Sequence, residues 1–247
     1  MKKYPLDKRQ RKFYNSVVMN NQLIISPIAY IRTDFKEKFG IPRQSGRAPA
    51  LLAEVVFCPE YRNADALREI EGFSHLWLLF DFSKAHKSEW SPTVRPPRLG
   101  GNKRVGVFAS RSPFRPNPIG LSCVKLECVK HTKEEGDVLV VSGADLLDGT
   151  PIFDVKPYLP HADCHLDATS GYAGEFENYR LEVSFPKELL SLLPTEKREG
   201  LLQCLADDPR PSYQDDPTRI YGMNFDDFEI KFTVANNKLT VLSVDKK

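Results

Sequence analysis

One stretch of this chain combines a rigid backbone with positive charge. Residues 90–126 include six prolines and neither aspartate nor glutamate, although the whole chain carries a net charge of only +2. Because proline fixes φ and lacks an N–H donor, most of this stretch cannot be helix or central strand. We expect a stiff loop around one short strand at residues 104–109. The basic residues of the whole stretch 90–126 are Arg95, Arg98, Lys103, Arg104, Arg111, Arg115 and Lys125.

A stiff cationic loop suits phosphates, carboxylates or nucleic acid, because its guanidinium groups are held at fixed spacing. The alternative is a basic surface that only keeps the protein soluble, and such a surface is usually dispersed and flexible. The proline spacing favours the binding interpretation.

Composition limits the remaining classes. A chain of 247 residues can bury a core in one large domain or two small ones. Its five cysteines are scattered without a Cys-x-x-Cys spacing, which favours a reducing, cytoplasmic setting over disulfides or a zinc site. No apolar run approaches the ~18 residues of a membrane span. The basic N-terminus lacks the apolar core of a signal peptide, so we expect residues 1–20 to be a flexible basic extension, with Met19 as an alternative start.

Strand patterns dominate the chain up to residue 171. We expect strands at residues 23–31, 53–57, 73–82, 121–131, 138–143 and 152–158, the first of them broken by Pro27. One short helix is expected at residues 63–71. Since no crossover helices separate the strands, an antiparallel sheet or barrel is favoured over a doubly wound α/β fold.

The pattern changes beyond residue 172. A strand at 179–185 precedes helices at 186–193 and 195–206, and Thr195 is a candidate N-cap. Two alternating strands, 228–234 and 239–244, are joined by Asn236-Asn237 as a hairpin. The sequence thus predicts a mainly β protein, with an antiparallel β-barrel domain at residues 21–171 and a small α+β domain at residues 172–247.

Several common cofactor motifs are absent. The glycines at positions 100, 101 and 106 do not form Gly-x-Gly-x-x-Gly between a strand and a helix, and there is no P-loop. Gly-x-Ser-x-Gly, His-Glu-x-x-His and kinase signatures are also missing. A nucleotide-like cofactor would therefore be bound without a Rossmann crevice.

Three short segments carry candidate chemistry. Residues 161–167 hold two histidines, a cysteine and two aspartates, which could bind a metal on a helix, but they follow Pro160 and are better interpreted as a polar surface loop. Residues 145–151 place two acids at a glycine turn, which could receive ribose hydroxyls or a cation, or be an ordinary tight turn. Residues 208–213 resemble the Asp-Pro-Pro-Tyr signature of amino-methylating enzymes with one insertion, and a proline-rich turn after a helix is the alternative.

Seven segments occur in an order that resembles one family. They are residues 38–46 (KFGIPRQSG), 73–80 (FSHLWLLF), 94–102 (VRPPRLGGN), 106–122 (GVFASRSPFRPNPIGLS), 145–151 (DLLDGTP), 156–160 (KPYLP) and 208–213 (DPRPSY). Together they resemble the TrmO-type (YaeB/TsaA-like) tRNA adenine-N6 methyltransferases. The resemblance extends over residues 23–234, and the SRSPFRPNPIG block is its most specific part.

The resemblance implies an S-adenosylmethionine-dependent enzyme built on a single-sheet β-barrel, which agrees with the missing Rossmann motif. It also implies a homodimer with the cofactor near its interface, and methyl transfer to N6 of threonylcarbamoyladenosine beside the anticodon of tRNA. The cofactor-binding residues that it implies are Pro42, Arg43, Gln44, Phe82, Ser83, Arg111, Leu121, Asp148, Gly149, Thr150 and Pro151. Ser83 stands where family members often have histidine.

Such a reaction makes modest demands on the protein. Positive charge on the sulfonium disappears in the transition state, so arginines belong on the methionine carboxylate or on tRNA phosphates. Alignment of N6 with the methyl group can contribute ~7 kcal/mol or more. Candidates for a general base are Asp148, then Asp208 and Tyr213, and candidates for binding the anticodon-loop backbone are Arg95, Arg98 and Arg115.

The proline-rich stretch therefore divides into a tRNA-facing part, residues 95–103, and a cofactor-binding part, residues 111–121. The small C-terminal domain is expected to contact tRNA, with a purely structural cap as the alternative. Two other functions remain open, a non-catalytic RNA-binding module and a methyltransferase with a small-molecule acceptor. Neither a metal nor a membrane partner is expected.

Overall fold

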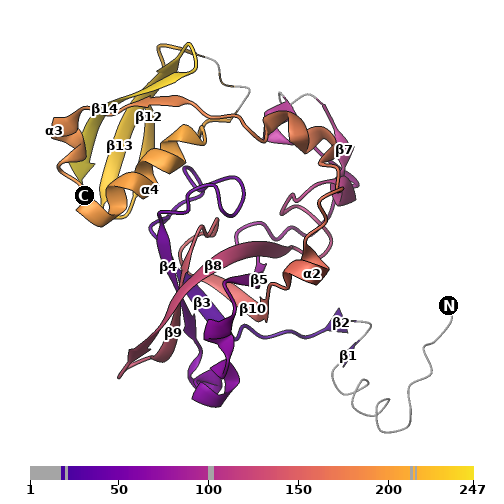
Figure 1. The fold of residues 1–247 in the computed structure, drawn as a ribbon. Coiled ribbons are helices and arrows are strands. Elements are labelled where there is room, and N and C mark those ends of the chain that lie inside the picture. The colour runs from indigo at the N-terminus through magenta and orange to yellow at the C-terminus, as the bar shows by residue number, and fades with distance from the viewer. Residues whose placement is uncertain (1–17, 20–21, 100–102, 212–213, 215) are drawn as a thin grey trace, which may run out of the picture.

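The computed structural model describes residues 18–19, 22–99, 103–211, 214 and 216–247. The predicted extension, residues 1–20, lies outside them apart from β1 (Val18–Met19), which pairs with β2 (Gln22–Leu23). Figure 1 shows two bodies, an N-terminal sheet in indigo to pink and a smaller C-terminal sheet in orange and yellow. The mainly β class predicted from the sequence is confirmed.

Six antiparallel strands form the N-terminal sheet. They are β3 (Ala29–Arg32), β4 (Leu52–Phe57), β5 (His75–Asp81), β8 (Ile119–Thr132), β9 (Gly136–Ser142) and β10 (Thr150–Pro157). Hydrogen-bonded neighbours follow the order β10-β3-β4-β9-β8-β5, and β10 pairs with both β3 and β5, so the ladder returns to its first strand. Every pairing in it is antiparallel, as expected for strands without crossover helices.

In most of these strands buried side chains alternate with more exposed ones, and the buried side chains form the core of the N-terminal sheet. In β5, Leu76, Leu78 and Phe80 are at most 5% exposed, and the residues between them are half-buried. In β8, Val124 is buried while Leu121 is 50% exposed. Since successive side chains point to opposite faces of a strand, Leu121 belongs to the outer face of the sheet.

Short turns replace the helix predicted at residues 63–71. They are η1 (Pro59–Tyr61), η2 (Ala64–Leu67) and η3 (Ile70–Gly72), all of 3-10 type. The helix prediction was wrong because Glu69 adopts a left-handed φ of 68°, which interrupts a continuous helix.

The proline-rich loop contains less strand than predicted. β6 (Thr93–Val94) pairs with β7 (Val105–Gly106), and the chain then turns through η5 (Val107–Ala109) instead of continuing the strand predicted at 104–109. Pro92 and Pro96 flank β6 and leave only two residues for pairing. A further turn, η4 (Pro97–Leu99), follows β6.

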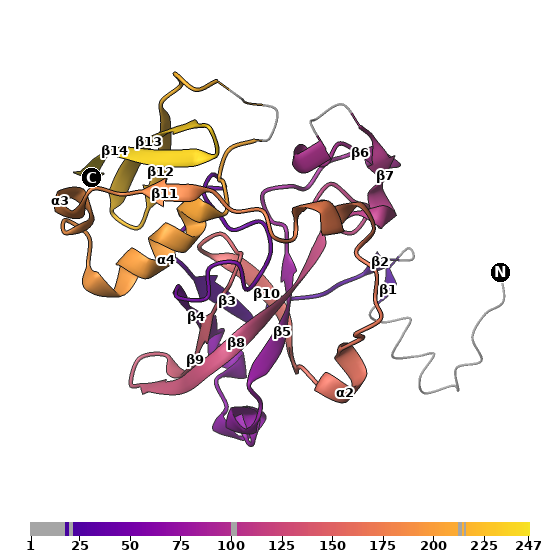
Figure 2. The same cartoon turned by 45° about the horizontal axis from the view of Figure 1, so that its top comes forward.

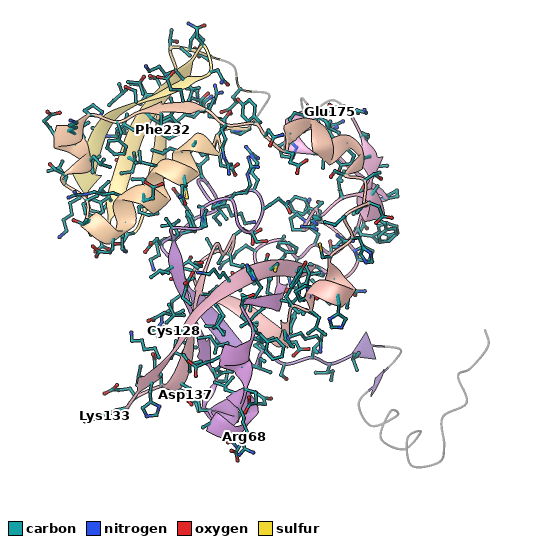
Figure 3. The ribbon with its side chains drawn as sticks, in the orientation of Figure 1. Arg68, Cys128, Lys133, Asp137, Glu175 and Phe232 are labelled. Carbon is teal, nitrogen blue, oxygen red and sulfur yellow. The ribbon has the colours of Figure 1, made fainter. Side chains whose placement is uncertain are left out.

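A second sheet forms the C-terminal body, in the order β11-β14-β13-β12. Its elements are β11 (Glu182–Ser184), α3 (Lys187–Leu190), α4 (Thr195–Ala206), β12 (Tyr221–Phe225), β13 (Phe228–Ala235) and β14 (Lys238–Lys246). Figure 2 shows α4 beside this sheet, and Leu201 and Leu205 of α4 share a buried cluster with Phe232, which Figure 3 labels. The predicted hairpin is confirmed, because Asn236 and Asn237 join β13 to β14 with φ of 50° and 60°.

Two expectations for this body were incomplete or wrong. Pro194, not Thr195, occupies the N-cap of α4, since Thr195 is already its first residue. The sequence prediction also missed β12, whose Gly222 and Asn224 have low strand propensity and are held by pairing with β13.

The loop between β3 and β4, residues 33–51, is built into the C-terminal body. Phe35 is 2% exposed and meets the ring of Phe225 edge-on at 6.1 Å between centroids. Leu51 packs so closely on α4 that a Cβ on Gly200 would lie 2.1 Å from its side chain. These contacts fix the loop that carries Pro42, Arg43 and Gln44 against the C-terminal body.

The segment between β10 and β11 runs from one body to the other. It contains α2 (Pro160–Asp163) and η6 (Gly171–Phe176). Figures 1 and 3 show η6, which carries the labelled Glu175, beside β7, and the Tyr172 hydroxyl donates to the carbonyl of Ala109 at 3.1 Å. The proline-rich loop is thereby attached to this segment. Over the described residues, no helix has both the length and the apolar character that crossing a membrane requires.

Candidate functional site

The segment 42–46 is held at both ends. The backbone N–H of Arg43 donates to Asp207 Oδ2 at 3.0 Å, and its guanidinium donates to the carbonyls of Asp208, at 3.2 Å, and Arg210. At the other end, the N–H of Gly46 donates to the carbonyl of Gly143 at 2.8 Å. The segment therefore spans from the C-terminal body to the N-terminal sheet.

Arg111 of the proline-rich loop reaches this segment. Its Nη1 donates to Gln44 Oε1 at 2.7 Å, and both side chains are exposed. The structure thus brings together two residues that the family resemblance assigns to the cofactor and that are 67 positions apart in the chain. The guanidinium keeps further donors for an anionic ligand, because one amide oxygen occupies only one of its five N–H groups.

Asp145 and Ser122 adjoin this pair. The sequence analysis considered Asp145 only as one of the two acids of the 145–151 turn, and it gave Ser122 no role. The Ser122 hydroxyl donates to Asp145 Oδ1 at 2.5 Å, and Ser122 is 3% exposed. Burial raises the pKa of Asp145, and the opposing influences are the Ser122 hydrogen bond, the Arg111 charge and the backbone of Ser45. Asp145 had a signal as the first acid of DLLDGTP, but nothing in the sequence distinguishes Ser122 from other strand serines.

The turn at residues 145–151, which we call the Asp148 turn, is bonded to the start of the β3–β4 loop. Asp148 Oδ1 accepts the N–H of Thr33 at 2.9 Å, and Oδ2 pairs with Lys36 Nζ at 2.8 Å. Gly149 adopts a φ of 71°, which suits glycine, and nothing lies within 4 Å of the position a Cβ would take there. Thr150 is buried and its hydroxyl donates to the carbonyl of Leu147 at 2.6 Å. The turn is therefore rigid, with open space beside Gly149.

Phe82, Ser83 and Leu121 lie just after β5 and at the start of β8. The Phe82 N–H donates to the carbonyl of Pro118 at 2.8 Å, and its ring meets Phe80 edge-on. Ser83 is exposed. Leu121 pairs with Leu79 in the strand register, on the outer face. Pro42 is buried, and Pro151 pairs with Tyr30 of β3.

Asp208 lies in a buried ion pair. Its Oδ1 accepts Arg210 Nε at 2.9 Å, its Oδ2 accepts Arg210 Nη2 at 3.1 Å, and the Tyr179 hydroxyl donates to Oδ2 at 3.0 Å. The neighbouring Asp207 accepts from Arg47 at 2.7 Å and from Arg180 at 2.5 Å. This cluster joins the two bodies. Tyr213, the third candidate base, lies outside the described residues.

The three arginines assigned to tRNA differ in their surroundings. Arg95 is exposed. Arg115 is half-buried and donates to the carbonyl of Ser110 at 3.1 Å, so it also supports the loop. Arg98 belongs to η4, and its side chain lies outside the described part of the chain.

The histidine-rich segment 161–167 is exposed. Asp163 accepts hydrogen bonds from Trp77 Nε1 at 3.0 Å and from the N–H of Leu159 at 2.8 Å, and these bonds lower its pKa. Across the described residues, no group of three His, Cys, Asp or Glu side chains is placed to hold a metal ion. Asp163 is thus engaged with the protein itself.

Comparison with protein families gives two matches. A family model described as the tRNA-methyltransferase O N-terminal domain matches residues 30–164, and one described as the TrmO C-terminal domain matches residues 178–247. This chain belongs to the TrmO family. The resemblance carried by the seven sequence segments is therefore confirmed.

Relatives of this TrmO-family protein align with it almost end to end. A protein of Escherichia coli (strain K12) named tRNA (adenine(37)-N6)-methyltransferase is 43% identical over 229 residues, which are 89% of this chain and 97% of the relative. A Pseudomonas aeruginosa protein named putative S-adenosylmethionine-dependent methyltransferase RcsF is 44% identical, over 83% of this chain and 90% of the relative. A crystal structure of TrmO from Pseudomonas aeruginosa has a TM-score of 0.73 and 36% identity, and it covers 91% of this chain and 99% of that one.

Proposed function

We propose that this TrmO-family protein is an S-adenosylmethionine-dependent tRNA methyltransferase that methylates N6 of threonylcarbamoyladenosine beside the anticodon. The observation that carries the proposal is the fixed segment 42–46, on which Gln44 meets Arg111 next to the hydrogen-bonded Ser122–Asp145 pair. The name of the E. coli relative supports N6 methylation of a tRNA adenine, and the name of the P. aeruginosa relative supports the cofactor.

The residues at this place fit the cofactor. Its methionine carboxylate needs donors, which Arg111 supplies, and its ammonium needs acceptors, which Asp145 supplies. A second donor is Arg43 Nε, which is buried and has no hydrogen-bond partner within the described residues. The adenine ring needs apolar surface, which the exposed Leu121 offers. When bound, S-adenosylmethionine supplies the methyl group from its sulfonium.

The protein's own part in the reaction is alignment and proton acceptance. Segment 42–46 and the Asp148 turn are both fixed by backbone hydrogen bonds, so groups bound to them keep their relative positions. Asp148 is our candidate to accept the N6 proton, because only one of its oxygens is bound to backbone and the other pairs with the exposed Lys36. Asp208 suits a positioning role, since Arg210 and Tyr179 already occupy its carboxylate.

The tRNA is assigned to the exposed basic face. Arg95 and Arg98 lie in the part of the proline-rich loop before residue 103, and Arg115 supports the loop from behind. Phosphate contacts of this kind position a nucleic acid without reading its sequence. In this arrangement residues 21–171 bind the cofactor and, through these arginines, part of the tRNA, and residues 172–247 add further tRNA contacts.

We further propose a cytoplasmic homodimer. The start of β8 exposes Leu121 at 50% and Ile119 at 40%, and Phe108 of the proline-rich loop is 72% exposed. Exposed apolar groups concentrated near one site favour burial against a second copy.

One experiment tests the reaction. Labelled methyl from S-adenosylmethionine is offered to bulk tRNA with and without the threonylcarbamoyl group, and incorporation is expected only with the group. Absence of incorporation in both samples would defeat the proposal. RNA affinity without S-adenosylmethionine affinity would identify a binding module, and transfer only to a small molecule would identify the other alternative.

A further inference from the structure

The C-terminal body contains a pocket that the cofactor site does not use. It has a volume of about 280 Å³. Its walls are Phe39, Pro211, Gln214, Arg219, Ile220, Tyr221 and Gly222, and we call it the Tyr221 pocket. Phe39 precedes segment 42–46 by three positions and Pro211 follows Arg210 directly. Two of its walls thus come from residues that are close in sequence to segment 42–46 and to Arg210. Its size suits one small group rather than a whole nucleotide.

Tyr221 lines this pocket and carries a polar atom that has no partner among the described residues. The residue is 5% exposed, and its buried hydroxyl has no hydrogen-bond partner within the described residues. Its ring cannot easily turn, because it stacks on Phe232 at 5.6 Å, and Phe39 stacks on Phe232 as well at 6.4 Å. A buried hydroxyl without a partner is costly, so its presence calls for a ligand atom that bonds to it.

Arg219 gives the pocket positive charge. Its guanidinium carbon lies 5.4 Å from the centroid of the Tyr221 ring, a cation–π arrangement that holds the side chain over the pocket. The nearby Asp216 does not line the pocket, and its carboxylate accepts the N–H and hydroxyl of Thr218. A guanidinium, a phenol and the Gln214 amide together offer several donors, and the described lining residues include no acid.

We infer that the Tyr221 pocket binds the carboxylate-bearing substituent on N6 of the target adenine. The inference rests on the proposed function and deepens it by locating substrate selection. Arg219 pairs with the carboxylate, the Tyr221 hydroxyl donates to an oxygen of the substituent, and Phe39 and Ile220 contact its aliphatic part. A site built to hydrogen-bond a substituent rejects the analogue that lacks it, because its own polar groups stay unpaired.

Binding measurements test this inference without any chemical step. Dissociation constants are measured for one tRNA with and without the threonylcarbamoyl group, in the absence of methyl donor. Wild-type protein is expected to prefer the modified tRNA. Arg219→Gln is expected to weaken binding of the modified tRNA by about tenfold or more while changing the unmodified one less than twofold. Tyr221→Phe is expected to act in the same direction with a smaller effect.

A matched control is Lys246→Gln, which removes one positive charge from the same body at the other end of its sheet, where Lys246 pairs with Phe228. It should leave the preference unchanged. Circular dichroism and thermal melting of each variant establish folding. Tyr221→Phe keeps the ring, so the measurement remains decisive if Arg219→Gln is unstable.

Two outcomes would overturn the inference. Equal affinity of the wild type for both tRNAs would show that the substituent is not bound. Equal weakening of both tRNAs by Arg219→Gln, with a salt slope flattened by about one unit, would identify a phosphate contact instead. Failure of the proposed function gives a different result from these two outcomes. In that case the wild-type protein still prefers the modified tRNA in the binding measurement but incorporates no methyl group.

Discussion

The carboxylate of Asp208 and the guanidinium of Arg210 form a two-point ion pair, with Nε–Oδ1 at 2.9 Å and Nη2–Oδ2 at 3.1 Å. Both side chains are about nine-tenths buried. Asp208 also adopts a φ of 54°, so the backbone is turned to present the carboxylate to a residue only two positions ahead. The segment 208–210 is therefore held in a bend by its own ion pair, where the two bodies meet.

Replacing Asp208 by asparagine is expected to destabilise the protein by about 3 kcal/mol, because Arg210 would stay buried without its counter-ion. Asparagine is chosen since it also tolerates a positive φ. Urea denaturation measures the change. A double-mutant cycle with Arg210→Gln separates the pair from its surroundings, and additive effects of the two substitutions would show that the pair is not coupled.

Arg111 is expected to bind the carboxylate of the cofactor. Arg111→Gln should weaken S-adenosylmethionine binding about tenfold or more, as for loss of a charged hydrogen bond. The affinity of Arg111→Lys should lie between those of the wild type and Arg111→Gln. Titration calorimetry gives the dissociation constants. The matched control is Arg32→Gln on the outer face of β3, where Arg32 pairs with Glu54 and Glu135. An unchanged constant for Arg111→Gln would remove Arg111 from the cofactor site.

Asp148 is expected to accept the N6 proton. Asp148→Asn should lower kcat about a hundredfold at saturating S-adenosylmethionine, as is typical for loss of a general base. Lys36→Gln is the control, because it removes only the exposed partner of Asp148, and exposed pairs contribute about 1 kcal/mol or less. A kcat within threefold of wild type for Asp148→Asn would show that no base is needed there.

Arg95 and Arg98 are expected to contact tRNA phosphates. Each substitution to alanine should reduce the slope of log affinity against log salt by about one unit, since one fewer counterion is released. The slope is measured by filter binding over a salt series, with Lys246→Gln as the control. If Arg98→Ala leaves the slope at its wild-type value, the assignment of that residue is wrong.

Asp145 links stability to pH. Burial raises its pKa in the folded protein above the ordinary aspartate value, so between the two pKa values the folded state binds more protons than the unfolded state, and stability falls as pH rises through that window. Asp145→Asn cannot ionise and can still accept the Ser122 hydrogen bond. It is expected to be more stable than wild type at pH 7, with the advantage shrinking as pH falls toward about 4.

Urea denaturation of both proteins from pH 4 to 8 measures that difference. The exposed Asp227→Asn serves as control, and its difference from wild type should not follow the Asp145 pattern. A difference for Asp145→Asn that stays constant with pH would contradict the role of burial.

Local patterns in the sequence were sufficient for most strands of the two sheets and for the small-domain hairpin, but not for β12 or for residues 104–109. Short apolar runs predict β4 and β5, and alternation of apolar and polar residues predicts β8, β13 and β14, because both patterns are visible in a single segment. Asn236-Asn237 predicts its turn because asparagine tolerates positive φ. The same local reasoning failed at residues 63–71, where one left-handed residue, Glu69, breaks a helical pattern that its sequence does not reveal.

The assembly of the candidate site was decided by tertiary structure alone. Gln44 meets Arg111, Ser122 meets Asp145, and Arg43 meets Asp208 and Arg210, across separations of up to 167 positions. The family motifs identified several of these residues by type, but not their partners. Such contacts depend on which strands pair and how the β3–β4 loop is buried, and these are properties of the whole packed chain. For the same reason the Tyr221 pocket has no sequence signature, since its walls come from three separate segments that only folding brings together.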